Sequence, residues 1–447
     1  MNYLKRKALE FQLNPPAVLA VGFLSLIIIG TILLNLPMAS KSGDSIGLID
    51  ALFTASSAVC VTGLIVVNTA EHWSLFGQII IITLIQIGGL GIMTMATSVA
   101  LIMGKRIRLK ERLAIKEQLN HESMGGLVKL TKYVIAVTFA IEAIGAFLLS
   151  FKFIPIYGVV KGTWYSIFHS ISAFCNAGFD ILGNSITPFV GDLWINAVIC
   201  ILIILGGLGF AVYADIYHKK RFKNLNLHSK FVLSITGILL LVGTVLLFLI
   251  EYDNPFTLKE LNLHDKVLAS FFQSTITRTA GFNSIDISAI KDTSAFLMVM
   301  LMFIGGSPGS TAGGIKTTTF ATLILTTIST IKGEKDVGVF NRRIGDDVIN
   351  KSLAIIIIGL TWILTVSFIL TITEKAAFLD VVFETTSAFA TVGVSRGITP
   401  SLSTIGKLLI TLTMYIGRVG ALTMAFALGH RRKHKKFREA EGHIIVG

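Results

Sequence analysis

The sequence predicts an all-α polytopic membrane protein with four pseudo-symmetric helix/pore-loop/helix repeats around one central pore. Three observations predict this fold class: an apolar composition, eight apolar stretches of spanning length, and a glycine-containing segment that occurs four times. Of the 447 residues, 53% are hydrophobic and only 15% are charged, and the mean hydropathy is +0.75. This composition excludes an ordinary soluble globular domain.

Eight apolar stretches each reach the roughly 20 residues that a helix needs to cross about 30 Å of hydrocarbon. These predicted spanning helices are residues 15–37, 74–103, 133–153, 193–217, 231–250, 296–331, 353–373 and 402–428. Lys5, Arg6 and Lys7 precede the first stretch, as in a signal peptide. That stretch is too long and lacks a small-residue cleavage site, so we interpret it as a retained anchor.

Topology explains the net charge of +13. Of the 39 Lys and Arg residues, 27 lie in the two termini and in alternate connecting segments. Under the positive-inside rule, both termini are therefore cytoplasmic in a multi-pass protein of the cell inner (plasma) membrane. This distribution disfavours nucleic acid as a partner.

Cys60, Cys175 and Cys200 have no ligand-like spacing, and we interpret them as buried side chains.

A short segment that ends in glycine lies between the two spans of each repeat, on the less basic side. The four closing glycines, separated by 115, 103 and 112 residues, are Gly63, Gly178, Gly281 and Gly393. A second glycine follows each of them by 25, 28, 24 and 24 residues, at Gly88, Gly206, Gly305 and Gly417. Two landmarks at nearly constant spacing in four copies indicate an internal repeat.

An amphipathic run precedes each closing glycine, for example 49–56 and 164–171. Runs of roughly 10 to 14 residues are too short to span a bilayer and are typical of re-entrant half-helices. The sequence thus predicts four half-helices beside the eight spans. We interpret His169 and Glu384, which lie on two of them, as packing or capping residues.

The repeats and their connections set the predicted domain boundaries. The repeats are residues 15–103, 131–217, 231–331 and 351–429. Cytoplasmic linkers cover 104–130, 218–230 and 332–350, with a cytoplasmic N-terminus at 1–14 and a basic tail at 430–447.

Nonhelical backbone at membrane depth predicts conduction. Such backbone is tolerated only where it is buried in protein or lines a water-filled cavity. Four loops related by pseudo-symmetry would converge on one axis, where their carbonyl oxygens replace the hydration shell of a monovalent cation. Glycine there permits a positive φ and a close backbone approach. The neighbouring side chains form no acidic ring, which disfavours multivalent ions.

The third repeat contains a candidate gate. Five glycines and a proline lie within ten residues of an apolar stretch, which cannot remain one continuous helix. A static kink is the alternative. The segment consists of Gly305, Gly306, Ser307, Pro308, Gly309, Ser310, Thr311, Ala312, Gly313, Gly314, Ile315 and Lys316. Arg418 stands where the first two repeats have Gly89 and Gly207, and a charge inside a span usually faces a cavity.

The four segments resemble the filter loops of the Trk/Ktr/HKT superfamily of potassium transporters, closest to the bacterial Ktr membrane subunit (KtrB/KtrD). The motifs are Thr62-Gly63-Leu64, Phe174-Cys175-Asn176-Ala177-Gly178-Phe179, Arg278-Thr279-Ala280-Gly281-Phe282-Asn283 and Thr391-Val392-Gly393. The resemblance covers essentially the whole chain. It implies that K⁺ binds the carbonyls of Val61, Thr62, Asn176, Ala177, Thr279, Ala280, Thr391 and Val392. Members that favour sodium often have Ser at the first glycine, so Gly63 favours potassium.

The resemblance also implies a gate and partners. The segment 305–316 is similar to the intramembrane loop that blocks the cavity beneath the filter, and Arg418 to the arginine below it. The resemblance implies a homodimer on a cytosolic RCK-type ring (KtrA/KtrC-like) that binds ATP or ADP, with no organic cofactor on this chain. The basic tail would face that ring or anionic lipid of the bilayer. Na⁺ as an activator stays open.

Two other function classes fit less well. A coupled secondary transporter often carries inverted repeats, whereas these repeats are parallel. A membrane-embedded hydrolase needs paired carboxylates or a metal constellation in one cavity, and the predicted helices carry no such group. We therefore expect a channel-like potassium uptake protein and no enzyme.

Overall fold

The computed structural model describes residues 15–91, 94, 127–420 and 423–424. The predicted N-terminus 1–14, most of the linker 104–130 and the basic tail 430–447 lie outside the described residues.

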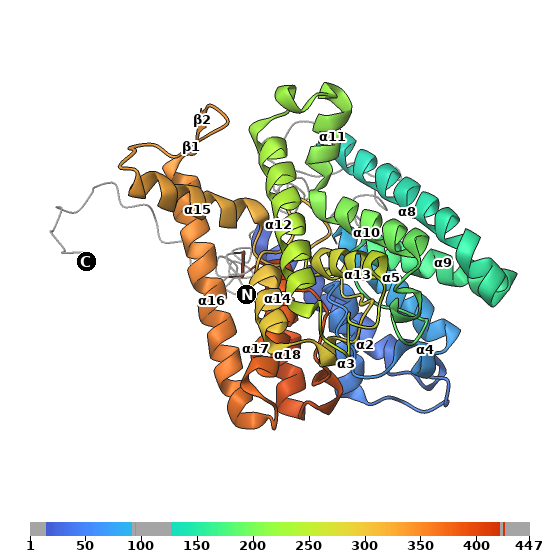
Figure 1. Cartoon of the computed structure of the whole chain (residues 1–447). Helices are drawn as coiled ribbons and strands as arrows, with labels where there is room; N and C mark the ends of the chain where they lie inside the picture. Colours follow the sequence, from blue (N-terminus) through green and yellow to red (C-terminus); the bar gives the residue numbers. More distant parts are fainter. Residues whose placement is uncertain (1–14, 92–93, 95–126, 421–422, 425–447) are drawn as a thin grey trace.

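Helices dominate the fold (Figure 1). Each repeat opens with a long helix: α2 (Pro15–Leu34), α8 (Leu127–Tyr157), α12 (Leu227–Glu251) and α16 (Asp346–Thr373). A shorter helix follows: α3 (Leu48–Val59), α9 (Val159–Phe174), α13 (Leu263–Ile276) and α17 (Phe378–Ala390). The third helices are α5 (Leu75–Leu90), α10 (Leu193–Leu208), α14 (Asp292–Phe303) and α18 (Thr404–Val419).

The remaining elements connect these units. The helices are α4 (Thr69–His72), α11 (Phe210–Lys219) and α15 (Thr317–Ile331). Single 3-10 turns are η1 (Pro37–Ala39), η2 (Thr187–Phe189), η3 (Phe222–Asn224), η4 (Ile287–Ala289) and η5 (Thr399–Ser401). The strands β1 (Gly338–Val339) and β2 (Arg342–Arg343) form an antiparallel hairpin, with Gly338 opposite Arg343.

Four of the described helices, α2, α8, α12 and α16, are long and apolar enough to cross a membrane alone. The bent pair of α10 and α11 is a fifth candidate span. The third helices α5 and α18 have 16 residues each, and both lead directly into residues that the structure does not describe. The structure thus establishes a helical fold with spanning helices, whereas the count of eight spans stays a prediction.

Glycines interrupt the third helices, which corrects one prediction. We predicted residues 193–217 as one spanning helix, and the single helix is wrong: α10 and α11 meet at 95°, and only as a bent pair do they form a candidate span. Gly209 separates them with φ of +94°. Gly91 and Gly420 end α5 and α18 with φ of +84° and +93°. Glycine has no Cβ and adopts this conformation freely. The helix therefore ends at Gly91, Gly209 and Gly420 in the first, second and fourth repeats.

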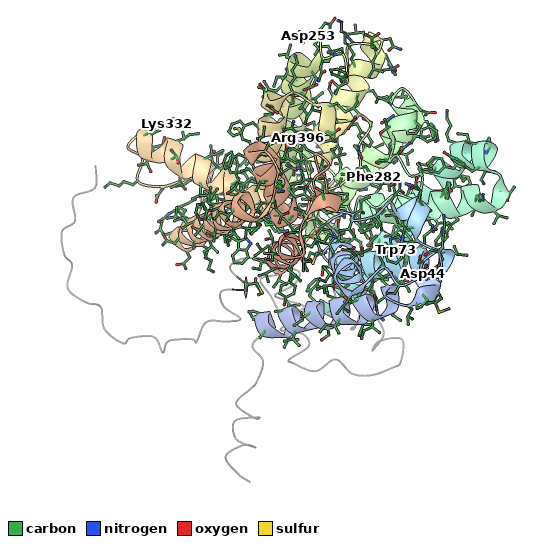
Figure 2. The ribbon with its side chains drawn as sticks, turned by 90° about the horizontal axis from the view of Figure 1, so that it is seen from below. Asp44, Trp73, Asp253, Phe282, Lys332 and Arg396 are labelled. Atoms are coloured by element: carbon green, nitrogen blue, oxygen red, sulfur yellow. The ribbon has the colours of Figure 1, made fainter. Side chains whose placement is uncertain are left out.

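Contacts between the repeats form a closed ring. Each short helix packs on the long helix of its own repeat and on the third helix of the preceding one. The pairs between repeats are α5 with α9, α10 with α13, α14 with α17, and α18 with α3. In the last pair, Lys407 Nζ lies 2.6 Å from Asp50 Oδ1. Figure 2 shows the chain passing around the centre in sequence order, with Phe282 inside and Asp44 and Asp253 at the rim.

The second glycine of each repeat permits the closest helix contact. A Cβ on this glycine would collide with a carbonyl oxygen in the last turn of a short helix in three repeats: Gly88 with Val59, Gly206 with Phe174, and Gly417 with Phe389. In the third repeat, Gly305 instead faces the carbonyl of Gly313. The repeat glycines are therefore packing sites, and the third one accommodates the nonhelical segment.

We predict that Gly88→Ala destabilises the protein, because its Cβ would overlap the Val59 carbonyl. Overpacking of this kind costs about 1–3 kcal/mol or more. The thermal midpoint of the detergent-solubilised chain should fall. Gly237→Ala on α12 is the matched control, since its Cβ meets no atom within 4 Å, and alanine there should be neutral or stabilising. Equal midpoints for the two variants would contradict the packing role.

Candidate ion-conduction site

Each short helix ends in a turn with the same backbone conformation. The residue two before the closing glycine and the glycine itself both have positive φ. The φ pairs are 56° and 98° at Val61 and Gly63, 59° and 69° at Asn176 and Gly178, 68° and 72° at Thr279 and Gly281, and 52° and 87° at Thr391 and Gly393. We call residues 61–63, 176–178, 279–281 and 391–393 the four glycine turns. In each turn, two residues with positive φ flank one residue with negative φ. This pattern occurs four times, in agreement with the sequence repeat.

The four glycine turns meet one another in cyclic order. The space beside each glycine is bounded by the carbonyl oxygen that precedes the glycine of the next repeat. A Cβ on Gly178 would lie 2.7 Å from Ala280 O, and one on Gly281 would lie 3.1 Å from Val392 O. The same relation holds between Gly63 and Ala177 and between Gly393 and Thr62. Backbone from all four repeats therefore surrounds a single axis.

The short helices hold the turns by their amide groups. The N–H groups of Thr62, Ala177 and Val392 each donate to a helix carbonyl at 2.8 Å. Gly63 N–H donates to Ser57 Oγ at 3.0 Å, and Gly393 N–H donates to Ser387 Oγ at 3.1 Å. The third turn differs, because Ala280 N–H donates to Ile276 O at 3.0 Å.

The carbonyls of the turns remain available. Among the described residues, no donor bonds to the oxygens of Val61, Thr62, Asn176, Ala177, Thr279, Ala280, Thr391 or Val392. All eight residues are buried. The C-terminal ends of α3, α9, α13 and α17 lead into the turns, and a helix C-terminus carries partial negative charge. The site therefore presents oxygen ligands and a negative potential, both suited to a cation.

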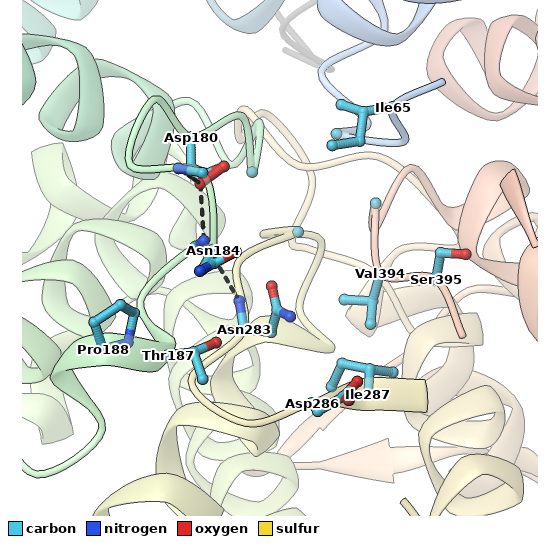
Figure 3. A pocket seen from close by; sticks show the side chains of 16 residues that line it. Ile65, Asp180, Asn184, Thr187, Pro188, Asn283, Asp286, Ile287, Val394 and Ser395 are labelled. Atoms are coloured by element: carbon cyan, nitrogen blue, oxygen red, sulfur yellow. Dashed lines mark hydrogen bonds between the residues drawn. The ribbon is translucent and has the colours of Figure 1, made fainter. Parts of the chain in front are cut away.

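A cavity of about 590 Å³, which we name the outer cavity after the predicted orientation, opens beside the turns. Its lining includes all four turn glycines, together with Asp180, Asn184, Asn283, Asp286 and Ser395 (Figure 3). Asp180 Oδ2 accepts hydrogen bonds from Ser185 N–H at 2.8 Å and Gly183 N–H at 3.1 Å. Burial raises the pKa of Asp180, although these two bonds oppose the shift. Carboxylates at the mouth raise the local concentration of cations.

The predicted interruption between α14 and α15 is present, and residues 304–316 are not helical. Gly305 N–H donates to Ile315 O at 2.8 Å, which closes the segment into a loop. Ser307 N–H donates to Gly207 O at 3.0 Å, and Thr311 N–H donates to Gly206 O at 3.1 Å. The segment therefore lies against the broken end of α10 in the second repeat.

The same segment reaches the turns from the side away from the outer cavity. Thr311 Oγ1 lies 3.0 Å from Asn176 Oδ1. A Cβ on Gly313 would collide with the side chain of Thr391, and one on Gly314 would meet Ala390 at 3.1 Å. These contacts involve residues that precede the turn glycines, whereas the outer cavity is lined by the glycines and by residues that follow them.

Arg418 ties the segment to the first repeat. Its guanidinium donates to the carbonyls of Thr311 and Gly88, and to Gly89 O at 3.2 Å. Lys316 Nζ donates to Ala312 O at 2.8 Å, within the segment. Both cations predicted at the candidate gate thus bond to backbone carbonyls: Arg418 joins the segment to the end of α5, and Lys316 bonds within the segment.

Sequence reasoning did not find the hydrogen-bond partners of Glu384. We interpreted it as a packing or capping residue, but its carboxylate accepts hydrogen bonds from Ser395 Oγ at 2.6 Å and from the Thr399 hydroxyl. It therefore joins α17 to the loop that follows Gly393. The available signal was a second acidic residue, after Asp380, on a short amphipathic half-helix. His169 is a packing residue, with its ring 5.6 Å from that of Phe153.

Apolar helices that enclose buried oxygen ligands define a membrane cation-transport protein. Residues 14–431 match the TrkH family of cation transport proteins. The chain belongs to this family and is an integral membrane protein, which confirms the family resemblance found in the sequence.

Relatives cover the full chain. It is 43% identical over 448 residues to Ktr system potassium uptake protein B of Bacillus subtilis, which spans 100% of both chains. It is also 43% identical to potassium/sodium uptake protein NtpJ of Enterococcus hirae, over 99% of this chain and 100% of the other. The potassium transporter TrkH of Vibrio parahaemolyticus has the same fold, with a TM-score of 0.72, 18% identity, and coverage of 92% and 85%.

We predict that Glu384→Ala lowers the thermal midpoint, because it removes the acceptor of the buried Thr399 hydroxyl and of the half-buried Ser395 hydroxyl. Leaving such groups unpaired costs about 1–3 kcal/mol. Glu384→Gln keeps one acceptor oxygen and should lose less. Glu334→Ala, on the connection after α15, serves as the control for loss of a carboxylate. A midpoint for Glu384→Ala equal to that of the control would exclude the bracing role.

Proposed function

We propose that the chain takes up potassium as the channel-like, pore-forming subunit of a Ktr-type system, and that it is not an enzyme. One observation carries the proposal: eight buried carbonyl oxygens of the four turns accept no hydrogen bond among the described residues, and four of them, one from each repeat, lie beside the glycine of a neighbouring turn. The names of the full-length relatives support it, because they describe potassium uptake and potassium/sodium uptake proteins.

The oxygens would form two layers. Those of Thr62, Ala177, Ala280 and Val392 precede the glycines directly, and those of Val61, Asn176, Thr279 and Thr391 lie one residue earlier. A dehydrated K⁺ would pass between layers, exchanging one set of oxygens for the next. Neutral carbonyls suit a monovalent ion that must also leave, whereas a carboxylate cage would retain multivalent ions.

The segment 304–316 would act as the gate. It lies on the inner side of the second and fourth turns, and Arg418 holds it through the Thr311 carbonyl. The charges of Arg418 and Lys316 would oppose an ion at the inner exit. Five glycines in the segment leave its backbone free to adopt a second conformation.

The remaining features of the proposal rest on the family. We infer eight spans with cytoplasmic termini in the plasma membrane, a homodimer, and a cytosolic RCK-type ring that binds ATP or ADP. The basic residues of the predicted cytoplasmic segments support that orientation. The potassium/sodium uptake relative supports Na⁺ as an activator or second cation.

We predict that Gly63→Ser reduces the preference for potassium. The side chain would be strained at φ of +98° and would press on the Ala177 carbonyl. The uptake ratio of ⁸⁶Rb⁺ to ²²Na⁺ in a bacterium deficient in potassium uptake should fall on the order of tenfold, which corresponds to about 1.4 kcal/mol. Gly397→Ser is the control, because its φ is +99° and no atom lies within 4 Å of its Cβ. An unchanged ratio for Gly63→Ser would sink the filter hypothesis.

We predict that Arg418→Met raises the basal flux. The substitution keeps an unbranched apolar side chain but removes the hydrogen bonds to Thr311, Gly88 and Gly89. Charge-assisted bonds contribute about 1.5–3 kcal/mol, so ⁸⁶Rb⁺ flux into proteoliposomes without a cytosolic partner should rise about tenfold. Arg343→Met, on the exposed hairpin, controls for loss of a cation. Flux equal to wild type would contradict the gate.

A further inference from the structure

Asn176 differs from its counterparts in the other three turns. Val61, Thr279 and Thr391 occupy the same position with positive φ, and none of them carries an amide. Asn176 is fully buried, and asparagine tolerates the left-handed conformation better than most residues. Its backbone therefore fits the turn. Its side-chain amide can also form hydrogen bonds that the other three side chains, which lack an amide, cannot form.

The side-chain amide of Asn176 bonds to three different elements. Nδ2 donates to Ile203 O in α10 at 3.3 Å and to Arg278 O in the approach to the third turn at 3.2 Å. Oδ1 accepts from Thr311 Oγ1 in the segment 304–316 at 3.0 Å. One buried side chain therefore joins the second turn, the third turn and the candidate gate.

The Thr311 hydroxyl has only one proton to donate. Besides Asn176 Oδ1, the oxygens of Gly206 and Phe174 lie near it, at 2.9 Å and 3.2 Å. Gly206 O also accepts from Thr311 N–H at 3.1 Å, whereas Asn176 Oδ1 has no second donor among the described residues and so depends on this hydroxyl. If the segment moves, Oδ1 loses its donor in a buried site, which is unfavourable.

The threonine hydroxyls at the positions that correspond to Asn176 make no hydrogen bond to the segment. Thr279 Oγ1 and Thr391 Oγ1 are buried without a hydrogen-bond partner in the described structure. Thr391 touches the segment at Gly313, but only by packing. Within the residues that the structure describes, Asn176 is therefore the one member of this layer that is hydrogen-bonded to the segment.

We propose that Asn176 is a positioning residue that couples the 304–316 segment to ion selectivity. With the segment in place, the Thr311 hydroxyl orients the amide, and Nδ2 holds the third turn through the Arg278 carbonyl. Departure of the segment releases Oδ1 and loosens the second and third turns together. Because coupling is reciprocal, the ion in the filter also biases the position of the segment. This inference rests on the proposed function.

The test compares the uptake ratio of ⁸⁶Rb⁺ to ²²Na⁺ among full-length variants in a bacterium deficient in potassium uptake. Thr311→Val removes the hydroxyl at nearly constant shape and should lower the ratio about fivefold, the effect expected for one buried hydrogen bond. Thr311→Ser keeps the hydroxyl and should retain the wild-type ratio. Thr365→Val is the matched control, since that hydroxyl bonds only to Thr361 O of its own helix.

Asn176→Thr copies the residue of the third and fourth turns and should lower the ratio at least as much as Thr311→Val, because it also removes the Nδ2 bonds to Ile203 O and Arg278 O. The double variant should be no worse than Asn176→Thr alone, because that substitution already removes the bond that Thr311→Val deletes. A Thr311→Val variant that changes total flux but not the ratio, or a double variant whose loss is the product of the single losses, would overturn the coupling.

The experiment distinguishes failure of the coupling from failure of the variant to accumulate and from failure of the proposed function. If Asn176→Thr does not accumulate in the membrane, the pair Thr311→Val and Thr311→Ser decides alone. Absence of ⁸⁶Rb⁺ uptake by the wild type would refute the proposed function itself. Normal wild-type uptake with equal ratios in the Thr311 pair would refute only the coupling.

Discussion

The structure depends on buried peptide oxygens that accept no hydrogen bond from the described protein. An unpaired buried carbonyl is unfavourable, so eight of them at one place require a surrounding structure that prevents their collapse. The short helices accept hydrogen bonds from the amide groups of the turns and so fix the turn backbone. A cation that replaces its water with these oxygens is the compensation that our proposed function supplies.

Closure of the ring requires close backbone contact between repeats. Glycines 88, 206 and 417 bring the third helices against the ends of the short helices, where any side chain would collide with a carbonyl. The third repeat departs from this rule, because its glycine faces residue 313 of the nonhelical segment. Three of the repeats thus pack their third helix tightly against a short helix. In the third repeat, the corresponding glycine packs against the glycine-rich segment instead.

The interactions of that segment cross the pseudo-symmetry. Arg418 binds it from the fourth repeat while also binding the first, and Asn176 meets it from the second. Residues from every repeat therefore contact one loop or its anchors. Such convergence makes the loop a suitable element for control of the pore, since a change at one position alters hydrogen bonds in several repeats.

The sequence by itself determined the repeat, the helical class, the turn glycines and the interruption in the third repeat, because composition, length and glycine spacing are local properties. It did not predict the break at Gly209, since glycine is also common inside membrane helices. Only the tertiary structure decided the partners of Glu384, Arg418 and Asn176. Their contacts join residues 11 to 330 positions apart, and hydrogen bonds over such separations depend on how the repeats close into a ring.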